Sequence, residues 1–246
     1  MALDKKIIIN AMNGNIKRTY ERYWHERIKE STGGEKNKEI SNEIFDTASS
    51  VLMEGDSILD VGCGDGHFAL HVKDKFNKIY GAEIAKEAAL IARKQEVLTS
   101  VMDLNSSLSY KDNTFDAVTC LDVVEHLLDP GSLIDEIYRV LKPDGQLVLT
   151  TPNIRNFRNL NTLIFRGIFP QTSPDTFVWG GGHLHFFTRK DINSIFKKAG
   201  FNRIRFFVNQ DQFLLSKKRK MVRLLTGEKV FGEWFCNSIT ISAYKE

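Results

Sequence analysis

The chain has 246 residues, of which 42% are hydrophobic, and it carries a formal net charge of +3. This length suits one sizeable domain with elaborations, and the hydrophobic content is sufficient for a full core. The mild charge argues against nucleic acid as a partner, and no apolar run approaches the roughly 18 residues that span a membrane. Three widely spaced cysteines, and an apolar start too short for a signal peptide, favour the reducing cytoplasm.

Residues 1–34 are predicted to form a separate N-terminal segment, because two glycines interrupt the chain before the first clear helical pattern. This segment is aromatic and basic around Tyr20, Tyr23 and Trp24. Beyond it, apolar residues recur with helical spacing in four stretches. These predicted helices cover residues 35–52, 85–94, 133–141 and 188–199. The last of them opens with a capping box at Thr188 and ends at Gly200.

Short apolar runs between these helices predict strands. They lie at residues 58–61, 78–81, 97–102 and 115–121, within 140–153, and at 201–208 and 237–244. The run within 140–153 follows a helix end and a Pro-Asp-Gly turn. Alternating strands and helices predict an α/β protein, with a parallel sheet that is covered by helices on both faces.

The stretch Ile58–Phe68, with the sequence ILDVGCGDGHF, is the most informative part of the chain. An apolar run leads to Asp60, and three glycines spaced two apart follow from Gly62. Glycines allow a tight turn in which the backbone itself touches a ligand. The dinucleotide-binding pattern G-x-G-x-x-G/A does not fit, because His67 stands three positions after Gly64. A dehydrogenase is therefore disfavoured.

Two further acids follow predicted strands. Glu83 closes the second strand, where a carboxylate can accept hydrogen bonds from both hydroxyls of a ribose. Asp103 closes the third strand, and Leu104 follows it. The carboxyl ends of parallel strands share one edge of the sheet, so this edge is the predicted ligand site.

The glycine turn and the strands after it resemble the class I S-adenosylmethionine-dependent methyltransferases, over roughly residues 55 to 155. Residues 115–153 resemble the branch that includes the ubiquinone-biosynthesis O-methyltransferases. The resemblance implies a Rossmann-like fold, a doubly wound and mostly parallel sheet of seven strands. It also implies that the last two strands pair antiparallel at one edge of the sheet.

The resemblance implies S-adenosyl-L-methionine as cofactor and S-adenosylhomocysteine as product. The implied cofactor-binding residues are Asp60, Gly62, Cys63, Gly64, Glu83, Ile84, Asp103, Leu104, Leu121 and Tyr20. In this interpretation Asp60 receives the ammonium group, Glu83 the ribose and Asp103 the adenine. Tyr20 or its aromatic neighbours would cover the sulfonium, since aromatic faces attract cations. The alternative is that these rings only pack one helix on the core.

His126 is the candidate catalytic residue, because it follows the fourth strand and could act as a general base. The alternative is that it only fixes the loop. Asp122, Glu125 and His126 would share one helix face, and in some ubiquinone-type relatives such a set is associated with a divalent metal. Here Asp replaces the usual Glu, and one His is an awkward ligand for Mg²⁺. We therefore predict no metal ligand and keep Mg²⁺ as the alternative.

Three regions lie outside the implied cofactor core and are expected to hold the acceptor: residues 1–34, a lid insertion at 153–182 and a basic insertion at 211–234. Residues 35–246 form the predicted methyltransferase domain with both insertions. We predict that the lid forms a short helix and a loop, and we expect its many apolar residues, Phe177 and Trp179 among them, to be buried. The basic insertion, with Phe213 and Leu214, suggests either a solvated helix face or peripheral membrane contact.

The predicted reaction moves a methyl group to a small-molecule or lipid-like acceptor, with oxygen favoured. An N- or C-methyltransferase and a non-catalytic S-adenosylmethionine-binding partner protein remain alternatives. His183 and His185 suit a structural and a catalytic role equally well. The sequence leaves the oligomeric state open.

Overall fold

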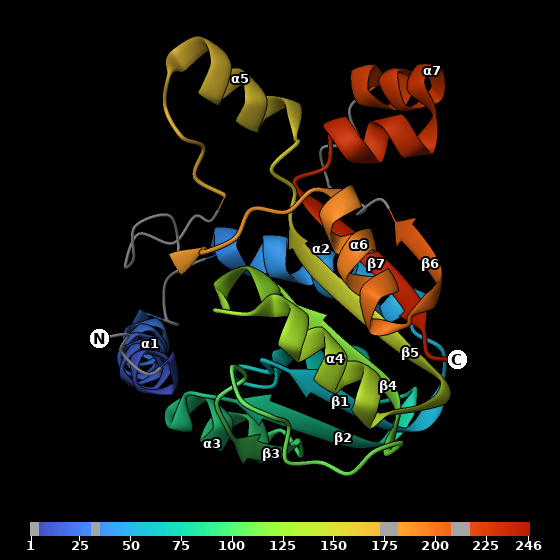
Figure 1. Ribbon diagram of the computed structural model, residues 1–246. Coiled ribbons are helices and arrows are strands. Elements are labelled where there is room, and N and C mark those ends of the chain that lie inside the picture. Colours follow the sequence, from blue (N-terminus) through green and yellow to red (C-terminus); the bar gives the residue numbers. More distant parts are fainter. Residues whose placement is uncertain (1–4, 31–34, 173–181, 208–216) are drawn as a thin grey trace.

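A computed structural model describes residues 5–30, 35–172, 182–207 and 217–246. Its centre is a seven-stranded sheet (Figure 1). The strands are β1 (Gly55–Val61), β2 (Phe76–Glu83), β3 (Leu98–Val101), β4 (Phe115–Leu121), β5 (Leu141–Pro152), β6 (Asn202–Phe207) and β7 (Ser238–Tyr244). Their order is β3-β2-β1-β4-β5-β7-β6.

The strands β1 to β5 are parallel, and β7 runs antiparallel to both of its neighbours. The predicted mostly parallel sheet with an antiparallel edge is therefore confirmed. The strand order reverses between β1 and β4, and such a switch point opens a crevice beyond the carboxyl ends of the strands. The glycine turn follows β1 at this crevice.

Helices cover both faces of the sheet. They are α1 (Lys5–Glu30), α2 (Glu35–Val51), α3 (Lys86–Lys94), α4 (Pro130–Val140), α5 (Phe157–Arg166), α6 (Arg189–Ala199) and α7 (Lys217–Trp234). Figure 1 shows α4 and α6 in front of the sheet and α2 behind it. Two single 3-10 turns, η1 (His67–His71) and η2 (Val124–His126), follow β1 and β4.

The alternation of side chains along β1 joins the two layers of the core. Ile58 packs with Ala48 of α2 and with Leu52 just after it, whereas the next residue, Leu59, belongs to the cluster that contains Leu133 and Ile137 of α4. Successive strand residues point to opposite faces, so one strand fills both layers. Packing on both faces of the sheet thereby holds β1, and with it the crevice at its carboxyl end, in place.

Local capping signals set the ends of two helices. The predicted capping box is present in α6, where Thr188 and Asp191 bond reciprocally, and Gly200 ends the helix at φ 101°. α4 starts three residues earlier than predicted. Asp129 caps it by accepting from the Ser132 N–H at 3.2 Å, and Pro130 occupies the first turn.

The helix predicted in the lid insertion is present as α5, but the expectation that its apolar residues are buried is wrong. No residue of α5 is buried, and Ile164 and Phe165 are 68% and 78% exposed. Phe177 and Trp179 lie outside the described residues. The basic insertion forms α7, which is kinked at Gly227. Phe213 and Leu214 lie outside the described residues as well.

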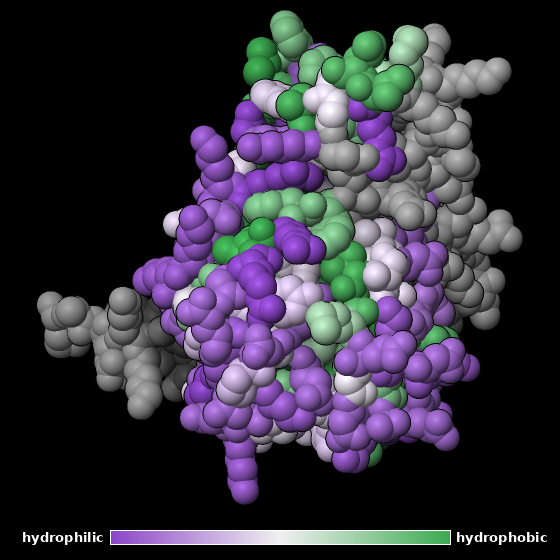
Figure 2. Space-filling view, turned by 90° about the vertical axis from the view of Figure 1, so that its right-hand side faces the viewer, coloured by the Kyte–Doolittle hydropathy of each residue, from purple (hydrophilic) through white to green (hydrophobic). Residues whose placement is uncertain are grey.

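α7 also carries exposed apolar side chains, since Leu224 and Leu225 are 83% and 77% exposed. Figure 2 shows the side of the molecule on which α7 and β6 lie, with apolar residues gathered at its top. Among the described helices, none has the length and apolar character needed to cross a membrane.

The single helix face predicted for Asp122, Glu125 and His126 is wrong. Only Val124–His126 forms a helical turn, and Asp122 precedes it with a left-handed φ of 53°. The chain thus turns sharply after β4. This turn, and not a helix, sets the orientation of the Asp122 side chain.

Candidate active site

The glycine turn after β1 requires glycine at its key positions. Gly62 and Gly64 have φ values of 77° and 53°, in the left-handed region that other residues rarely adopt. A Cβ on Gly62 would lie 2.4 Å from Val123, and one on Gly64 would lie 2.6 Å from the ring of Trp24. The turn predicted from the spacing of the glycines is therefore present. The side chains of Val123 and Trp24 pack closely against it.

The N-terminal segment reaches this turn through α1. Trp24 lies against Gly64, and the ring of Tyr20 meets that of His126 edge-on with centroids 5.9 Å apart. Tyr23 instead pairs with Trp24 and Arg27. Tyr20 and Trp24 are thus the aromatic residues placed at the crevice.

The carboxylates of Asp60 and Glu83 are buried and hydrogen-bonded within the protein. Asp60 is 6% exposed and accepts from the Thr119 hydroxyl at 2.7 Å. Glu83 accepts from the N–H of Gly64 at 2.9 Å and from the N–H of Ala85 at 2.8 Å. Glu83 therefore ties the end of β2 to the glycine turn. Each carboxylate oxygen has a second lone pair for a ligand hydroxyl.

Burial raises the pKa of both acids. It raises the pKa of Asp60 to about 7, and the nearby charge of Glu83 adds to this. Burial also raises the pKa of Glu83, although the backbone N–H groups of Ala85 and Gly64 oppose the shift. A partly protonated Asp60 can donate as well as accept a hydrogen bond.

The remaining predicted cofactor residues lie along the same edge. Asp103 follows β3 and accepts from the N–H of Asn105 at 2.9 Å, and Leu104 beside it is buried. Ile84, after Glu83, is half-buried. The predicted residues from β1, β2 and β3 are thus brought to one edge.

Cys63 and Leu121 serve the packing around this edge. Cys63 is buried beneath the turn, and its Sγ would lie 2.5 Å from a Cβ on Gly81. Leu121 is half-buried and packs against the cluster that contains Ile58 and Ala117. Both residues therefore shape the crevice through contacts within the core.

His126 lies at the end of η2, and a backbone carbonyl orients its ring. Its Nδ1 lies 3.2 Å from the carbonyl oxygen of Gly182. A carbonyl only accepts hydrogen bonds, so Nδ1 carries the proton and the lone pair of the neutral ring lies on Nε2. The ring of His183 stands edge-on to His126, with centroids 4.6 Å apart.

The two histidines that follow Gly182 differ in their placement. His183 faces His126 and pairs with the Thr172 hydroxyl at 2.6 Å. Burial, together with the proximity of the titratable His126, lowers the pKa of His183 to about 4. His185 bonds the Leu127 carbonyl at 2.9 Å through Nε2. Sequence reasoning did not separate the two residues, because which one meets His126 depends on a contact between distant segments.

Glu125 is 1% exposed and connects three parts of the site. Its carbonyl accepts from the N–H groups of Leu184 and His185 at 2.8 and 3.0 Å. Its Oε2 accepts from the Thr151 hydroxyl at 3.1 Å, whereas Oε1 has no hydrogen-bond partner among the described residues. Burial and the charge of Asp122 raise the pKa of Glu125 well above its usual range.

The grouping of potential metal ligands differs from the predicted one. Asp122 accepts from the Thr150 hydroxyl at 2.8 Å. The ligand atoms of Glu125, His126 and His183 lie within 4.8 Å of one another. Two imidazole nitrogens and one carboxylate suit a transition ion such as Zn²⁺ better than Mg²⁺, which prefers oxygen ligands. His183, which the sequence-based set lacked, completes this group.

A family model described as a methyltransferase domain matches residues 22–205. The chain belongs to this methyltransferase family. The predicted resemblance is thereby confirmed, and the crevice occupies the position at which ligands bind in doubly wound sheets.

Curated relatives carry the name ubiquinone biosynthesis O-methyltransferase. The protein of Alkalilimnicola ehrlichii is 33% identical over 119 residues, which are 46% of this chain and 47% of the relative. The protein of Hydrogenovibrio crunogenus is 28% identical over 156 residues, or 60% of this chain and 63% of the relative. The chain spans about half the length of the curated relatives that it matches.

Solved methyltransferase structures share the fold. One from Thermotoga maritima, described as a possible histamine N-methyltransferase, has a TM-score of 0.69 at 20% identity and covers 94% of this chain and 100% of its own. An S-adenosylmethionine-dependent methyltransferase of Archaeoglobus fulgidus has a TM-score of 0.61 at 20% identity, with coverage of 90% and 99%. The predicted Rossmann-like fold is confirmed.

Proposed function

We propose that the chain is an S-adenosylmethionine-dependent methyltransferase that methylates an oxygen of a small-molecule or lipid-like acceptor in the cytoplasm. The observation that carries this proposal is the setting of His126. Its Nδ1–H donates to the Gly182 carbonyl, so Nε2 is the nitrogen that can take a proton from an acceptor hydroxyl. Its ring contacts Tyr20 from α1, which brings the N-terminal segment to the same place.

The residues at the crevice fit S-adenosylmethionine as cofactor. When bound, this cofactor supplies a methyl group on a carbon that its sulfonium activates. The side chains of Asp60, Glu83 and Asp103 offer oxygen acceptors near the ends of β1, β2 and β3. The glycine turn lets the backbone approach a ligand. Tyr20 and Trp24 would exclude water and attract the sulfonium through their ring faces.

The names of the curated relatives support an oxygen acceptor. An oxygen acceptor has to lose a proton, whereas many nitrogen acceptors react without a base. Positioning in a dry site supplies much of the remaining rate enhancement, about 7–11 kcal/mol in favourable cases. The role of His126 therefore separates the oxygen proposal from N- or C-methylation.

The test is turnover of S-adenosylmethionine with a panel of catechols, phenols, sugars and amines. The informative variant is His126→Asn, because the Asn amide can keep a donor to the Gly182 carbonyl but cannot act as a base. We expect kcat on the oxygen acceptor to fall by roughly 10²–10⁴-fold, with S-adenosylhomocysteine affinity little changed. His71→Asn, at a residue paired with Asp46 on α2, serves as the control.

Each failure has a distinct meaning. Turnover on amines alone, with His126→Asn nearly silent, would replace oxygen by nitrogen. Absence of S-adenosylhomocysteine binding to the wild-type chain would remove the cofactor assignment itself.

A second candidate is a non-catalytic S-adenosylmethionine-binding partner protein. The exposed apolar side chains of α5 and of the residues after it favour this candidate, because such surfaces often contact other molecules. Ile164 and Phe165 of α5 are 68% and 78% exposed, and Phe169, which follows the helix, is 54% exposed. This candidate predicts S-adenosylhomocysteine binding without turnover on any acceptor. It also predicts that replacing these side chains leaves cofactor binding intact but abolishes association with a partner.

A further inference from the structure

A cavity of about 620 Å³ lies between the start of α6, the end of β6 and α7. In the sheet, β6 is four strands away from β1, which corresponds to roughly 19 Å at the usual strand spacing. The cavity is therefore separate from the glycine turn. Its volume falls within the range of roughly 300–1,000 Å³ that is typical of small-molecule sites.

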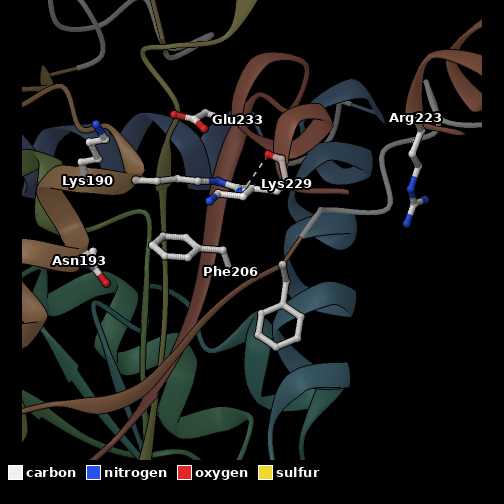
Figure 3. A pocket seen from close by; sticks show the side chains of 8 residues that line it. Lys190, Asn193, Phe206, Arg223, Lys229 and Glu233 are labelled. Atoms are coloured by element: carbon white, nitrogen blue, oxygen red, sulfur yellow. Dashed lines mark hydrogen bonds between the residues drawn. The ribbon is translucent and has the colours of Figure 1, made fainter. Parts of the chain in front are cut away.

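The side chains around this cavity are mostly basic and aromatic (Figure 3). They are Arg189, Lys190, Asn193, Phe206, Phe207, Arg223, Lys229 and Glu233. Glu233 is the acid among these eight, and it is already ion-paired with Arg155. The lining thus has an excess of positive charge, which favours an anionic ligand.

Arg189 is one of the residues that line this cavity, and two contacts hold its guanidinium. Its Nη1 donates to the carbonyl of Lys229 at 3.5 Å, drawn as a dashed line in Figure 3. Its guanidinium carbon lies 5.2 Å from the centroid of the Phe206 ring. Both contacts orient the guanidinium, and neither of them uses its Nε or Nη2.

The Nε and Nη2 atoms of Arg189 are buried and have no hydrogen-bond partner among the described residues. These two N–H groups are the parallel pair with which a guanidinium binds two oxygens of one carboxylate or phosphate. Buried donors of a charged group are costly to leave unpaired. The arrangement is explained if a ligand with two acceptor oxygens completes it.

We propose that this cavity binds a phosphate group, with the Nε and Nη2 of Arg189 as its bidentate donors. Lys190 and Lys229 are exposed and can add positive charge at the rim, which suits a phosphate dianion better than a single carboxylate. Phe206 and Phe207 provide an apolar wall for the organic part of a phosphate ester. The ester is either a soluble phosphomonoester or the headgroup of an anionic lipid. This site does not depend on the proposed methyl transfer.

The first experiment is thermal unfolding at constant ionic strength with three kinds of probe. They are inorganic phosphate, hexyl phosphate as a soluble ester, and phosphatidylcholine vesicles with or without phosphatidic acid. A ligand at 100 times its Kd should raise Tm by roughly 5–10 °C for a chain of this size. A saturable rise that chloride does not reproduce is the expected result.

Variants of Arg189 decide whether the rise comes from this cavity. Arg189→Met keeps the length of the side chain and its contact with Phe206 but removes the donors, and should weaken phosphate binding by roughly 10–100-fold. Arg189→Lys keeps a charge without the fork and should fall in between. The matched control is Arg203→Met, since Arg203 is an exposed arginine of β6 that is paired with Asp144 at 2.6 Å.

The outcomes distinguish the two sources of phosphate and the two proposals. Binding of hexyl phosphate alone identifies a soluble ester, and binding of only the phosphatidic acid vesicles identifies a lipid headgroup. Either result supports the site if Arg189→Met abolishes it and Arg203→Met does not. The site is overturned if no probe binds, or if both variants respond alike. The shift with S-adenosylhomocysteine, measured on the same samples, reports folding and the cofactor assignment separately.

Discussion

Glu83 and Glu125 are both buried at the ends of parallel strands, yet their surroundings differ. Both oxygens of Glu83 accept backbone N–H groups, from Gly64 and Ala85. Glu125 has one bonded oxygen, and its Oε1 has no partner among the described residues. Both carboxylate oxygens of Glu83 therefore have backbone partners within the protein. In contrast, Oε1 of Glu125 can still accept a hydrogen bond from another molecule.

The same contrast separates two parts of the molecule. Residues 55–121, the parallel part, hold their acids and glycines in tight internal contacts. Residues 122–246, the outer part, contain the incomplete donors of Arg189 and the exposed apolar side chains of α5 and α7. The outer part differs from the parallel part in these local features, although its strand β5 is as deeply buried as β4.

The largest expected effect concerns Asp60 in the parallel part. Its pKa in the folded chain is about 7, above the ordinary value of 3.8, so the folded state holds a proton that the unfolded state releases between these values. The free energy of unfolding should therefore fall as the pH rises from about 4 to about 7, by at most about 4 kcal/mol.

Urea unfolding of the wild type and Asp60→Asn across this range measures the effect. The variant should lack the fall, because its amide does not titrate. Asp56→Asn is the control, since Lys78 lowers the pKa of the exposed Asp56 and its contribution changes only at more acidic pH. Parallel curves for the wild type and Asp60→Asn would show that Asp60 is ionised throughout.

A smaller effect is expected for Gly64→Ala, compared with Gly167→Ala at the end of α5. Both glycines have a left-handed φ, of 53° and 62°, which costs alanine about 1–2 kcal/mol. A Cβ on Gly64 would also lie 2.6 Å from Trp24, whereas one on Gly167 has nothing within 4 Å. We expect a total loss of about 2–4 kcal/mol for Gly64→Ala.

Chemical unfolding of both variants, together with S-adenosylhomocysteine binding, checks this prediction. Only Gly64→Ala should weaken the cofactor analogue. Equal losses of stability for the two variants would contradict the close packing of Trp24 on the turn.

The smallest effect separates the two glutamates directly. Glu83→Gln places an amide where two backbone donors need acceptors, and should cost about 1–3 kcal/mol. Glu125→Gln keeps the acceptor for Thr151 and replaces a carboxyl whose raised pKa favours the neutral form, so we expect a cost below about 1 kcal/mol. Denaturant unfolding at neutral pH measures both. A loss for Glu125→Gln as large as that for Glu83→Gln would mean that the two sites are equally complete.

Much of the fold could be predicted because its signals are local. The glycine spacing after Asp60 predicted the turn, and Thr188 with Asp191 predicted the start of α6, as the structure confirms. The predicted face of Asp122, Glu125 and His126 was wrong, because helical spacing assumes a helix and the chain turns at Asp122 instead. The lid prediction gave the right helix but the wrong burial, since burial depends on what covers it.

The sequence by itself determined the strands, the helices between them, the glycine turn and the family, because these follow from short-range patterns in the chain. Only the tertiary structure decided that Trp24 lies on Gly64, that His183 and not His185 meets His126, and that the fork of Arg189 lacks a partner among the described residues. These contacts join residues tens of positions apart. Their pairing depends on how the folded layers meet, and no periodicity in the chain encodes it.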